Sequence, residues 1–371
     1  MSKHILITGG AGFIGSHLAD ALIKEGCSVR ALDNLSEQVH GPDASRPDYL
    51  NPEVELVLGD VRDRDIVEKA LDGIDAVYHF ASAVGVGQSM YEIEKYVDIN
   101  SRGTAVLLEA LSKRNIERLV VASSMSIYGE GLYYSTDGKV HSKASRSLEQ
   151  LRCAQWEALD ENGEPLNPIP TPETKTPSLS SVYALTKYDQ ERACLMIGRA
   201  YGIPTVALRF FNVFGTRQAF SNPYTGVLAI FGARLLNDKA PMIYEDGNQK
   251  RDFVSVYDVA NACLLALTVP EAVDKVFNIG SGMPYSIMEV AEKMAFVFGK
   301  DIRPEVSGKY RMGDIRHCFA DIGLARKILK YEPEVTLEEG LRELSKWLEG
   351  KDAFDRVAEA RAELEGRGLT I

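Results

Sequence analysis

Short apolar runs alternate with longer amphipathic stretches along roughly the first 215 residues of the chain. The short runs predict buried strands, whereas the longer stretches repeat apolar residues every three or four positions and predict helices. The predicted strands span 4–8, 28–33, 54–60, 75–82, 118–126 and 204–213. The predicted helices are 13–25, a helix ending at 71, 100–113 and 182–201. Strands that alternate with helices indicate an α/β fold with a parallel sheet buried on both faces.

The alternation weakens after Gly215. Short strand-like pieces at 242–244 and 276–279 mix with predicted helices at 226–236 and 286–298. Such a mixture predicts a second, smaller unit beside the sheet. We therefore expect a large unit over 1–214, which the chain re-enters at about 251–270, and a smaller lobe over 215–350 that closes over the sheet.

Two further segments stand apart from this pattern. The segment 130–182 carries five prolines and shows helical periodicity only at about 145–159. A connection of this length is either a lid over a binding site or a packed surface insertion, and the pattern favours neither. The charged tail 351–371 is predicted to be helical up to about 367, as a surface helix or as a partner-binding helix.

Charge and cysteine content exclude several classes of function. The chain carries 42 Lys and Arg against 53 Asp and Glu, a net charge of −11, which is unfavourable for nucleic-acid binding. We expect no transmembrane helix and no signal segment, because no apolar run is long enough. The five cysteines are scattered without a Cys-x-x-Cys pair, which predicts neither a disulfide framework nor a metal site. These features indicate a cytoplasmic protein with no nucleic-acid or membrane partner.

A glycine-rich loop directly follows the first predicted strand. The run Thr-Gly-Gly-Ala-Gly-Phe-Ile-Gly at 8–15 gives Gly10, Gly12 and Gly15 the dinucleotide-binding spacing, with Gly9 as an additional glycine. Glycines at these positions let the backbone approach a pyrophosphate at the N-terminus of the following helix. In this strand–turn–helix context the loop predicts a dinucleotide site.

Acidic residues at the ends of the next two strands indicate which dinucleotide binds. Asp33 lies 18 residues beyond Gly15, where a carboxylate accepts hydrogen bonds from ribose hydroxyls and repels a 2′-phosphate. This placement favours NAD over NADP. Asp60 and Val61 follow the third strand and either contact the adenine or form a turn.

A tyrosine and a lysine share one face of a predicted helix. Tyr183 and Lys187 are four residues apart, so the ammonium lies near the phenol and favours its ionised form. An unperturbed tyrosine has a pKa of about 10, so use as a base near pH 7 needs help of ~4 kcal/mol. Ser123 and Ser124 end the fifth predicted strand, at the same edge of the sheet as the glycine loop.

In combination these motifs resemble the extended short-chain dehydrogenase/reductase family, in particular its nucleotide-sugar epimerases and dehydratases. The resemblance extends from about Lys3 to Gly350. It depends on TGGAGFIG at 8–15, HFAS at 79–82, Asn100, SSMSIYG at 123–129, YALTK at 183–187, RFFNVFG at 209–215, RDFVSVYDV at 251–259 and RMGDIRHCFAD at 311–321. It implies a Rossmann doubly wound parallel sheet, a smaller α/β substrate-binding lobe, an NAD cofactor and a nucleoside-diphosphate sugar substrate.

The same resemblance implies roles for individual residues. Tyr183 is expected to be the catalytic base and acid, Lys187 to tune it and hold the nicotinamide ribose, and Ser124 to bind the reacting hydroxyl. The expected cofactor-binding residues are Gly9, Gly12, Phe13, Ile14, Gly15, Asp33, Asn34, Asp60, Val61, Phe80, Ala81, Ser82, Asn100, Ser123, Tyr183, Lys187 and Phe210. The expected substrate-binding residues are Ser124, Ser126, Tyr183, Asn212, Val227, Leu228, Tyr244, Arg251, Arg311 and Asp314.

Within this set, the arginines and their neighbours are expected to bind the nucleotide. The resemblance implies that Arg251 and Arg311 clamp the diphosphate, that Asn212 contacts it and that Asp314 holds the ribose. Guanidinium groups suit phosphate oxygens, although either arginine alone is equally compatible with a surface salt bridge. Tyr244 is compatible with packing on the base or in the core.

The residues after Ser124 narrow the expected reaction. Related 4,6-dehydratases carry an Asp-Glu pair at these two positions, whereas this chain has Met125 and Ser126. Neither is a usable acid or base near neutral pH. The resemblance therefore favours 4-epimerisation through a transient 4-keto sugar, and a 4-keto sugar reductase that consumes NADH is the alternative.

The substrate and the oligomeric state stay open at this point. The insertion 130–182 resembles that of the dTDP-6-deoxyhexose 4-epimerases, which favours a dTDP-6-deoxy sugar as the substrate. UDP-glucose and UDP-N-acetylglucosamine are the alternative substrates. The resemblance also implies that Cys318 is a small residue at a gate beside the sugar. Relatives pair the helices that follow Asn100 and Tyr183, which implies a homodimer. The apolar positions on these helices fit such a bundle or packing on the sheet: Val106, Leu107, Leu111, Ala193 and Ile197.

Overall fold

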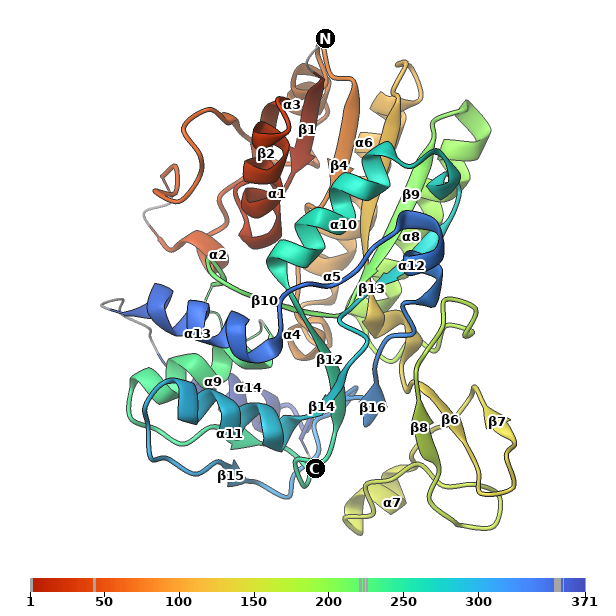
Figure 1. Ribbon diagram of the computed structural model, residues 1–371, viewed down its shortest axis with the longest axis vertical. Coiled ribbons are helices and arrows are strands. Elements are labelled where there is room, and N and C mark those ends of the chain that lie inside the picture. Colours follow the sequence, from red (N-terminus) through yellow and green to blue (C-terminus); the bar gives the residue numbers. More distant parts are fainter. Residues whose placement is uncertain are drawn as a thin grey trace.

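The computed structural model describes residues 3–42, 45–219, 222, 224, 226–349, 355 and 357–370. These residues form a large sheet with helices on both faces and, below it in Figure 1, a smaller lobe of helices and short strands. No helix among the described residues is long and apolar enough to cross a membrane.

The large unit is built on a seven-stranded, fully parallel sheet. Its strand order is β13-β9-β5-β4-β1-β2-β3, so the chain winds outward from β1 in both directions. The strands are β1 His4–Thr8, β2 Ser28–Asp33, β3 Glu55–Leu58, β4 Ala76–His79, β5 Arg118–Ser124, β9 Thr205–Phe210 and β13 Val276–Ile279. The six predicted strands of this sheet are confirmed, with ends that shift by a few residues.

The seventh strand corrects the sequence-based division of the chain. The segment 276–279 was expected in the smaller lobe, and this prediction is wrong because β13 pairs in parallel with β9. Its Phe277 and Ile279 are fully buried in the core of the large unit. The chain therefore re-enters this unit further along than 251–270.

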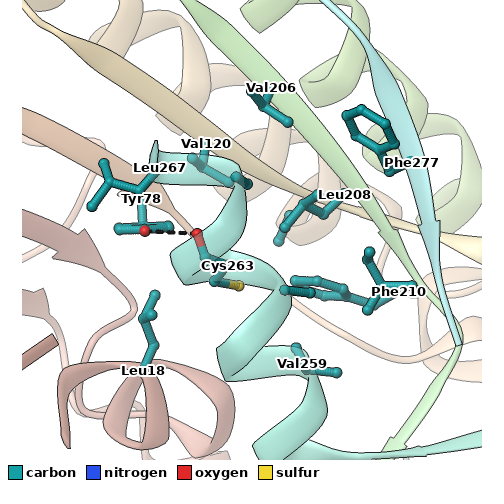
Figure 2. Packing of buried hydrophobic residues seen from close by; sticks show 14 of the residues in the cluster. Leu18, Tyr78, Val120, Val206, Leu208, Phe210, Val259, Cys263, Leu267 and Phe277 are labelled. Carbon is teal, nitrogen blue, oxygen red and sulfur yellow. Dashed lines mark hydrogen bonds between the residues drawn. The ribbon is translucent and has the colours of Figure 1, made fainter. Parts of the chain in front are cut away.

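Helices cover both faces of the sheet because successive strand residues point to opposite sides. One face packs against α1 Phe13–Lys24, α10 Val256–Thr268 and α12 Gly323–Leu329, and the other against α3 Arg64–Ala70, α6 Gly103–Leu111 and α8 Val182–Tyr201. Figure 2 shows the first of these faces, where the Tyr78 hydroxyl donates a 2.9 Å hydrogen bond to the carbonyl of Cys263 in α10.

Helix α8, which carries Tyr183 and Lys187, has clear start and stop signals. The Ser181 hydroxyl accepts a hydrogen bond from the backbone N–H of Ala184, and Gly202 ends the helix in the left-handed conformation. The predicted helix 100–113 also forms, but its first turn is π-helical over Val97–Arg102. The remaining short helices of the large unit are α2 Glu37–His40, α4 Val86–Ser89 and α5 Ile93–Tyr96.

The smaller lobe has its own apolar core. It lies between α9 Val227–Leu236, α11 Ile287–Val297 and α13 Leu337–Leu348. Short strands join it to the large unit: β10 Asn212–Phe214, β12 Lys250–Ser255, β14 Pro284–Ser286 and β16 His317–Cys318 form one sheet, and β11 Met242–Ile243 pairs with β15 Glu305–Val306. The described part of the predicted tail is helical in α14 Val357–Gly366, whereas 351–354 and 356 lie outside the described residues.

The insertion 130–182 forms a small three-stranded antiparallel sheet of β6 Leu132–Tyr134, β7 Val140–His141 and β8 Asn167–Ile169. The helix expected at about 145–159 is reduced to α7 Leu148–Arg152. Polar contacts dock the insertion on the lobe: Arg146 and Glu245 form a buried ion pair at 2.8 Å, and the Nε2 atom of His317 lies 2.9 Å from a carboxylate oxygen of Glu157. These contacts favour a packed insertion over a free lid.

A buried ion pair supports the sheet beneath Ser123. Arg209 on β9 donates to Glu191 on α8 at 2.7 and 2.8 Å, and the Ser123 hydroxyl donates to the same carboxylate at 2.6 Å. Arg209 is 5% exposed and Glu191 is fully buried. Removing one partner of such a pair leaves a buried charge without compensation.

We expect Glu191→Gln to lower the free energy of unfolding by about 3 kcal/mol, because Arg209 then keeps its charge without a counter-ion. Thermal unfolding followed by circular dichroism measures the effect. Arg199→Ala, which removes an exposed arginine from the same helix, is the matched control and should change stability by less than about 0.5 kcal/mol. Equal melting temperatures for the two variants would contradict the stabilising role of the pair.

Candidate functional site

A cavity of about 800 Å³ lies at the carboxyl ends of the central strands. Its lining comes from the segments that follow β1, β2, β3, β4, β5 and β9, and from residues 212–228 at the edge of the lobe. The strand order reverses between β1 and β4, and ligands of open α/β sheets bind in the crevice at this point.

The glycine loop forms the floor of this cavity. Gly9 has a φ of +73°, and a Cβ on it would stand 2.9 Å from the backbone nitrogen of Ala81. A Cβ on Gly15 would stand 2.7 Å from the Cα of Gly10, so any side chain there would open the turn. Gly12 caps α1 without a side-chain hydrogen bond, which leaves the positive end of the helix facing the cavity.

Asp33 is held in place beside the loop. Its carboxylate accepts hydrogen bonds from the backbone N–H of Ala11 at 3.0 Å and of Leu35 at 2.9 Å. The carboxylate thus has a fixed position at the cavity wall. There it can accept hydrogen bonds from ribose hydroxyls, and its negative charge repels a phosphate.

Asp60 lies at the same end of the cavity and is tied to an arginine. Hydrogen bonds from Arg62 hold the pKa of Asp60 down to about 2, and the Asn34 amide donates to the carboxylate at 3.0 Å. Asn34, Asp60 and Val61 all line the cavity, as expected for an adenosine end. Asp60 can therefore form the turn after β3 and also lie beside an adenine, so the two alternatives given for it are compatible.

Three predicted catalytic residues lie together at the other end. Ser124, Tyr183 and Lys187 all line the cavity, together with Phe80, Ala81, Ser82, Ser123 and Phe210. Burial raises the pKa of Tyr183, and a hydrogen bond with Ser124 opposes the rise. Burial lowers the pKa of Lys187 to about 8. The arrangement can move a proton to or from a ligand hydroxyl.

A buried hydrogen-bond network lies behind Lys187. The ammonium donates to the Gln190 side chain at 2.8 Å, and the Gln190 amide donates to the Thr104 hydroxyl at 2.9 Å. His79 lies between the Thr104 and Thr8 hydroxyls at 2.8 Å from each. Burial lowers the pKa of His79 to about 3, so this ring is neutral and positions its neighbours.

Two predicted site residues lie behind the cavity wall instead of lining it. Ser126 is buried and donates to the Ser124 hydroxyl at 2.9 Å. Asn100 is fully buried in the π-helical turn, where it accepts from the backbone N–H of Ala83 at 2.7 Å and donates to Thr186 at 2.9 Å. Ser126 thus positions Ser124, and Asn100 positions Ala83, and both of these partners line the cavity. Met125 is buried and adds no acid or base.

The residues expected on the substrate divide into two groups. Asn212, Val227 and Leu228 line the cavity, whereas Tyr244, Arg251, Arg311 and Asp314 are not among its lining residues. Arg311 pairs with Asp314 at 2.8 Å and lies over the Tyr244 ring.

Arg251 also has its hydrogen bonds inside the chain. It donates to the backbone carbonyls of Arg316, at 2.9 Å, and Ile315. Cys318, expected at a gate beside the sugar, is buried and lies 3.9 Å from the Thr171 hydroxyl. The diphosphate clamp and the gate therefore stay predictions.

Several cavity residues carry no motif and escaped sequence analysis. Gln38 and His40 reach the cavity from α2, Gln88 reaches it from α4, and Gln218 reaches it from the connection before α9. Gln38 and Gln88 exchange hydrogen bonds at 3.0 and 3.3 Å, which joins α2 to α4 across the cavity edge. Their only sequence signal is a position shortly after a strand end.

The cavity fits a dinucleotide on its own geometry. It offers a bare helix N-terminus for a pyrophosphate, a fixed carboxylate for a ribose, and the apolar Phe80 and Phe210 for a ring. The Oδ1 atom of Asn212 and the Oε1 atom of Gln218 are buried and have no hydrogen-bond partner among the described residues. Such atoms are satisfied when a polar ligand occupies the cavity. Nowhere in the described chain do three His, Cys, Asp or Glu side chains form a metal-binding group.

Comparisons with known proteins agree with this geometry. The NAD dependent epimerase/dehydratase family matches residues 5–280. A dTDP-L-rhamnose 4-epimerase of Burkholderia thailandensis is 37% identical over 93% of this chain and 95% of its own.

Two solved structures are similar over almost the whole chain. The UDP-glucose 4-epimerase of Thermotoga maritima with UDP-glucose has a TM-score of 0.76 at 30% identity, covering 93% of this chain and 98% of its own. The UDP-glucuronic acid 4-epimerase of Bacillus cereus with UDP-glucuronic acid and NAD has a TM-score of 0.74 at 28% identity, covering 93% and 99%. The chain therefore belongs to the NAD dependent epimerase/dehydratase family, as an NAD-dependent enzyme of the isomerase class, among the nucleotide-sugar 4-epimerases.

Proposed function

We propose that this protein is a dTDP-6-deoxyhexose 4-epimerase, with dTDP-L-rhamnose as its substrate. The observation that carries epimerisation is the grouping of Ser124, Tyr183 and Lys187 at one end of the cavity, with Met125 and Ser126 in place of a further acid and base. The similarity to the B. thailandensis protein supports the choice of sugar and base.

The chain's own residues supply the proton chemistry and the positioning. Tyr183 takes the proton of the C4 hydroxyl and later returns it to the other epimer. Lys187 favours the phenolate through its positive charge, and Ser124 orients the reacting hydroxyl. Bound NAD supplies the redox chemistry, because it accepts the C4 hydrogen as hydride and gives it back. The sugar turns over between the two transfers, so its C4 configuration is inverted.

Arg251, Arg311, Asn212 and Asp314 hold the nucleoside diphosphate in this proposal, with Tyr244 beside the base. Asn212 lines the cavity, whereas the other four do not, so the proposal includes a movement of side chains or of a covering segment when substrate binds. A fixed diphosphate leaves the sugar free to rotate, which inversion requires.

The proposed enzyme is a cytoplasmic homodimer, although the dimer face differs from the expected apolar positions. Leu107 and Leu111 are fully buried against the sheet, and Val106, Ala193 and Ile197 pack on the same core. Exposed apolar side chains lie elsewhere on these helices: Val97, Leu185 and Met196 are 44%, 51% and 62% exposed. These exposed apolar side chains fit a surface on which the helices pack against a second copy of the chain.

We expect the purified protein to interconvert the C4 epimers of dTDP-L-rhamnose with no added cofactor, because NAD is regenerated in each cycle. Proton NMR of the C4 region follows the reaction, and UDP-glucose and UDP-N-acetylglucosamine are run in parallel. Epimerisation of the UDP sugars alone would retain the mechanism and overturn the substrate. Turnover of a 4-keto sugar only after addition of NADH would instead identify a reductase. Solvent deuterium at C4 would contradict direct hydride return.

We expect Tyr183→Phe to lower kcat by about 10³-fold with its NAD content unchanged, because it removes one hydroxyl that transfers protons. Tyr188→Phe on the same helix is the matched control, since Tyr188 packs against the core of the large unit. Activity by NMR and NAD content by absorbance after denaturation separate catalysis from binding. A Tyr183→Phe variant with more than about one tenth of the activity would exclude Tyr183 as the base.

A further inference from the structure

We propose that the C-terminal segment 357–370 is a strap that lies in the nucleoside diphosphate groove and that a nucleotide sugar displaces when it binds. This inference rests on the proposed function, which assigns Tyr244, Arg311 and Asp314 to the nucleotide. The strap consists of α14, drawn faint behind α9 and α11 in Figure 1, and the residues that follow it.

One leucine inserts the strap between the two units. Leu364 is 4% exposed, although the residues on either side of it are exposed. A Cβ on Gly87 of α4 would stand 3.6 Å from Leu364 Cδ2 and 3.8 Å from Arg311 Cδ. Leu364 and Arg311 therefore lie side by side against α4 of the large unit, and Leu364 covers one side of the arginine.

The end of the strap covers the backbone beside the same arginine. The N–H of Met312 donates to the carbonyl of Leu369 at 2.9 Å, and Arg311 forms an antiparallel bridge with Thr370. The Thr370 hydroxyl is buried without a hydrogen-bond partner among the described residues. A buried hydroxyl without a hydrogen bond raises the free energy of the closed strap and so favours its opening.

One carboxylate of the strap pairs with a cation of the lobe. Glu365 pairs with Lys309 at 2.7 Å, and within the strap it also pairs with Arg361 at 2.8 Å. Arg367 lies 4.5 Å from the centre of the Tyr91 ring, just beyond α4. Glu365 therefore occupies a cation only two residues before Arg311, where an anionic ligand would compete with it.

These contacts hold the strap weakly enough to open. The side chains of its Lys309–Glu365 pair with the lobe are 41% and 38% exposed, and exposed pairs contribute little to stability. A strap that is closed about 90% of the time weakens the apparent affinity for a ligand about tenfold, because only the open fraction binds. Unseating the strap should therefore tighten nucleotide binding, whereas a wall of the binding site would have the opposite effect.

The test measures binding of UDP and of dTDP to the NAD-loaded full chain by titration calorimetry. We expect Leu364→Asp to lower the dissociation constant at least about threefold, and Leu364→Ala to lower it less. Ala362→Asp is the matched control, because it adds the same charge to an exposed position on the same helix and should leave the dissociation constant unchanged. Unchanged or weaker binding by both Leu364 variants would overturn the strap.

Hydrogen exchange gives a second readout that does not depend on a variant. Addition of the nucleoside diphosphate that binds should raise exchange over 357–370 and lower it around Arg311 and Asp314. Lower exchange over 357–370 would instead identify a wall that the ligand completes. Tight binding by the wild type with no change in this segment overturns the strap and leaves the proposed function standing. Binding of neither nucleotide by the wild type or by Leu364→Asp overturns the nucleotide assignment itself, and the strap with it.

Discussion

A continuous run of buried hydrogen bonds joins the glycine loop to the catalytic helix. It starts at Thr8, at the end of β1, passes through His79 and Thr104, and reaches Lys187 through Gln190. These side chains are at most 3% exposed, so each depends on the next for its hydrogen bond. The neutral His79 ring is suited to this place, because it can donate on one side and accept on the other. The glycine-loop end of the cavity and the end that holds Tyr183 and Lys187 are thereby fixed relative to each other.

Much of this arrangement could be predicted because it is local in sequence. The strand ends, the glycine loop and the i, i+4 spacing of Tyr183 and Lys187 each occupy one short stretch, and short stretches carry their own backbone and periodicity signals. The segment 276–279 was misplaced because an isolated four-residue apolar strand does not reveal which sheet it joins. Leu107 and Leu111 were equally ambiguous, since an apolar helix face fits a sheet or a second subunit until its burial is known.

The positions of the residues that we propose bind the nucleotide could not be predicted from the sequence, for a different reason. Tyr244, Arg251 and the Arg311–Asp314 pair come from three segments of the lobe, and their positions relative to the cavity depend on how the lobe, the insertion and α14 pack. Gln38 and Gln88 meet only because α2 and α4 approach each other across the cavity. Contacts between distant segments have no characteristic spacing in the sequence, so they can be identified only from the tertiary structure.

Burial shifts the pKa values of Tyr183 and Lys187 in opposite directions, but in both cases it disfavours the charged form. It raises the pKa of the phenol and lowers that of the ammonium to about 8, so both groups are biased towards their neutral forms. A phenolate and an ammonium formed together stabilise each other, and a positively charged ring placed in the cavity favours the phenolate further. In the proposed reaction the phenolate would therefore be most populated with the oxidised cofactor bound, which is the state in which a C4 hydroxyl has to lose its proton. Loss of that positive charge on reduction would favour the protonated phenol, which is the form that has a proton to return.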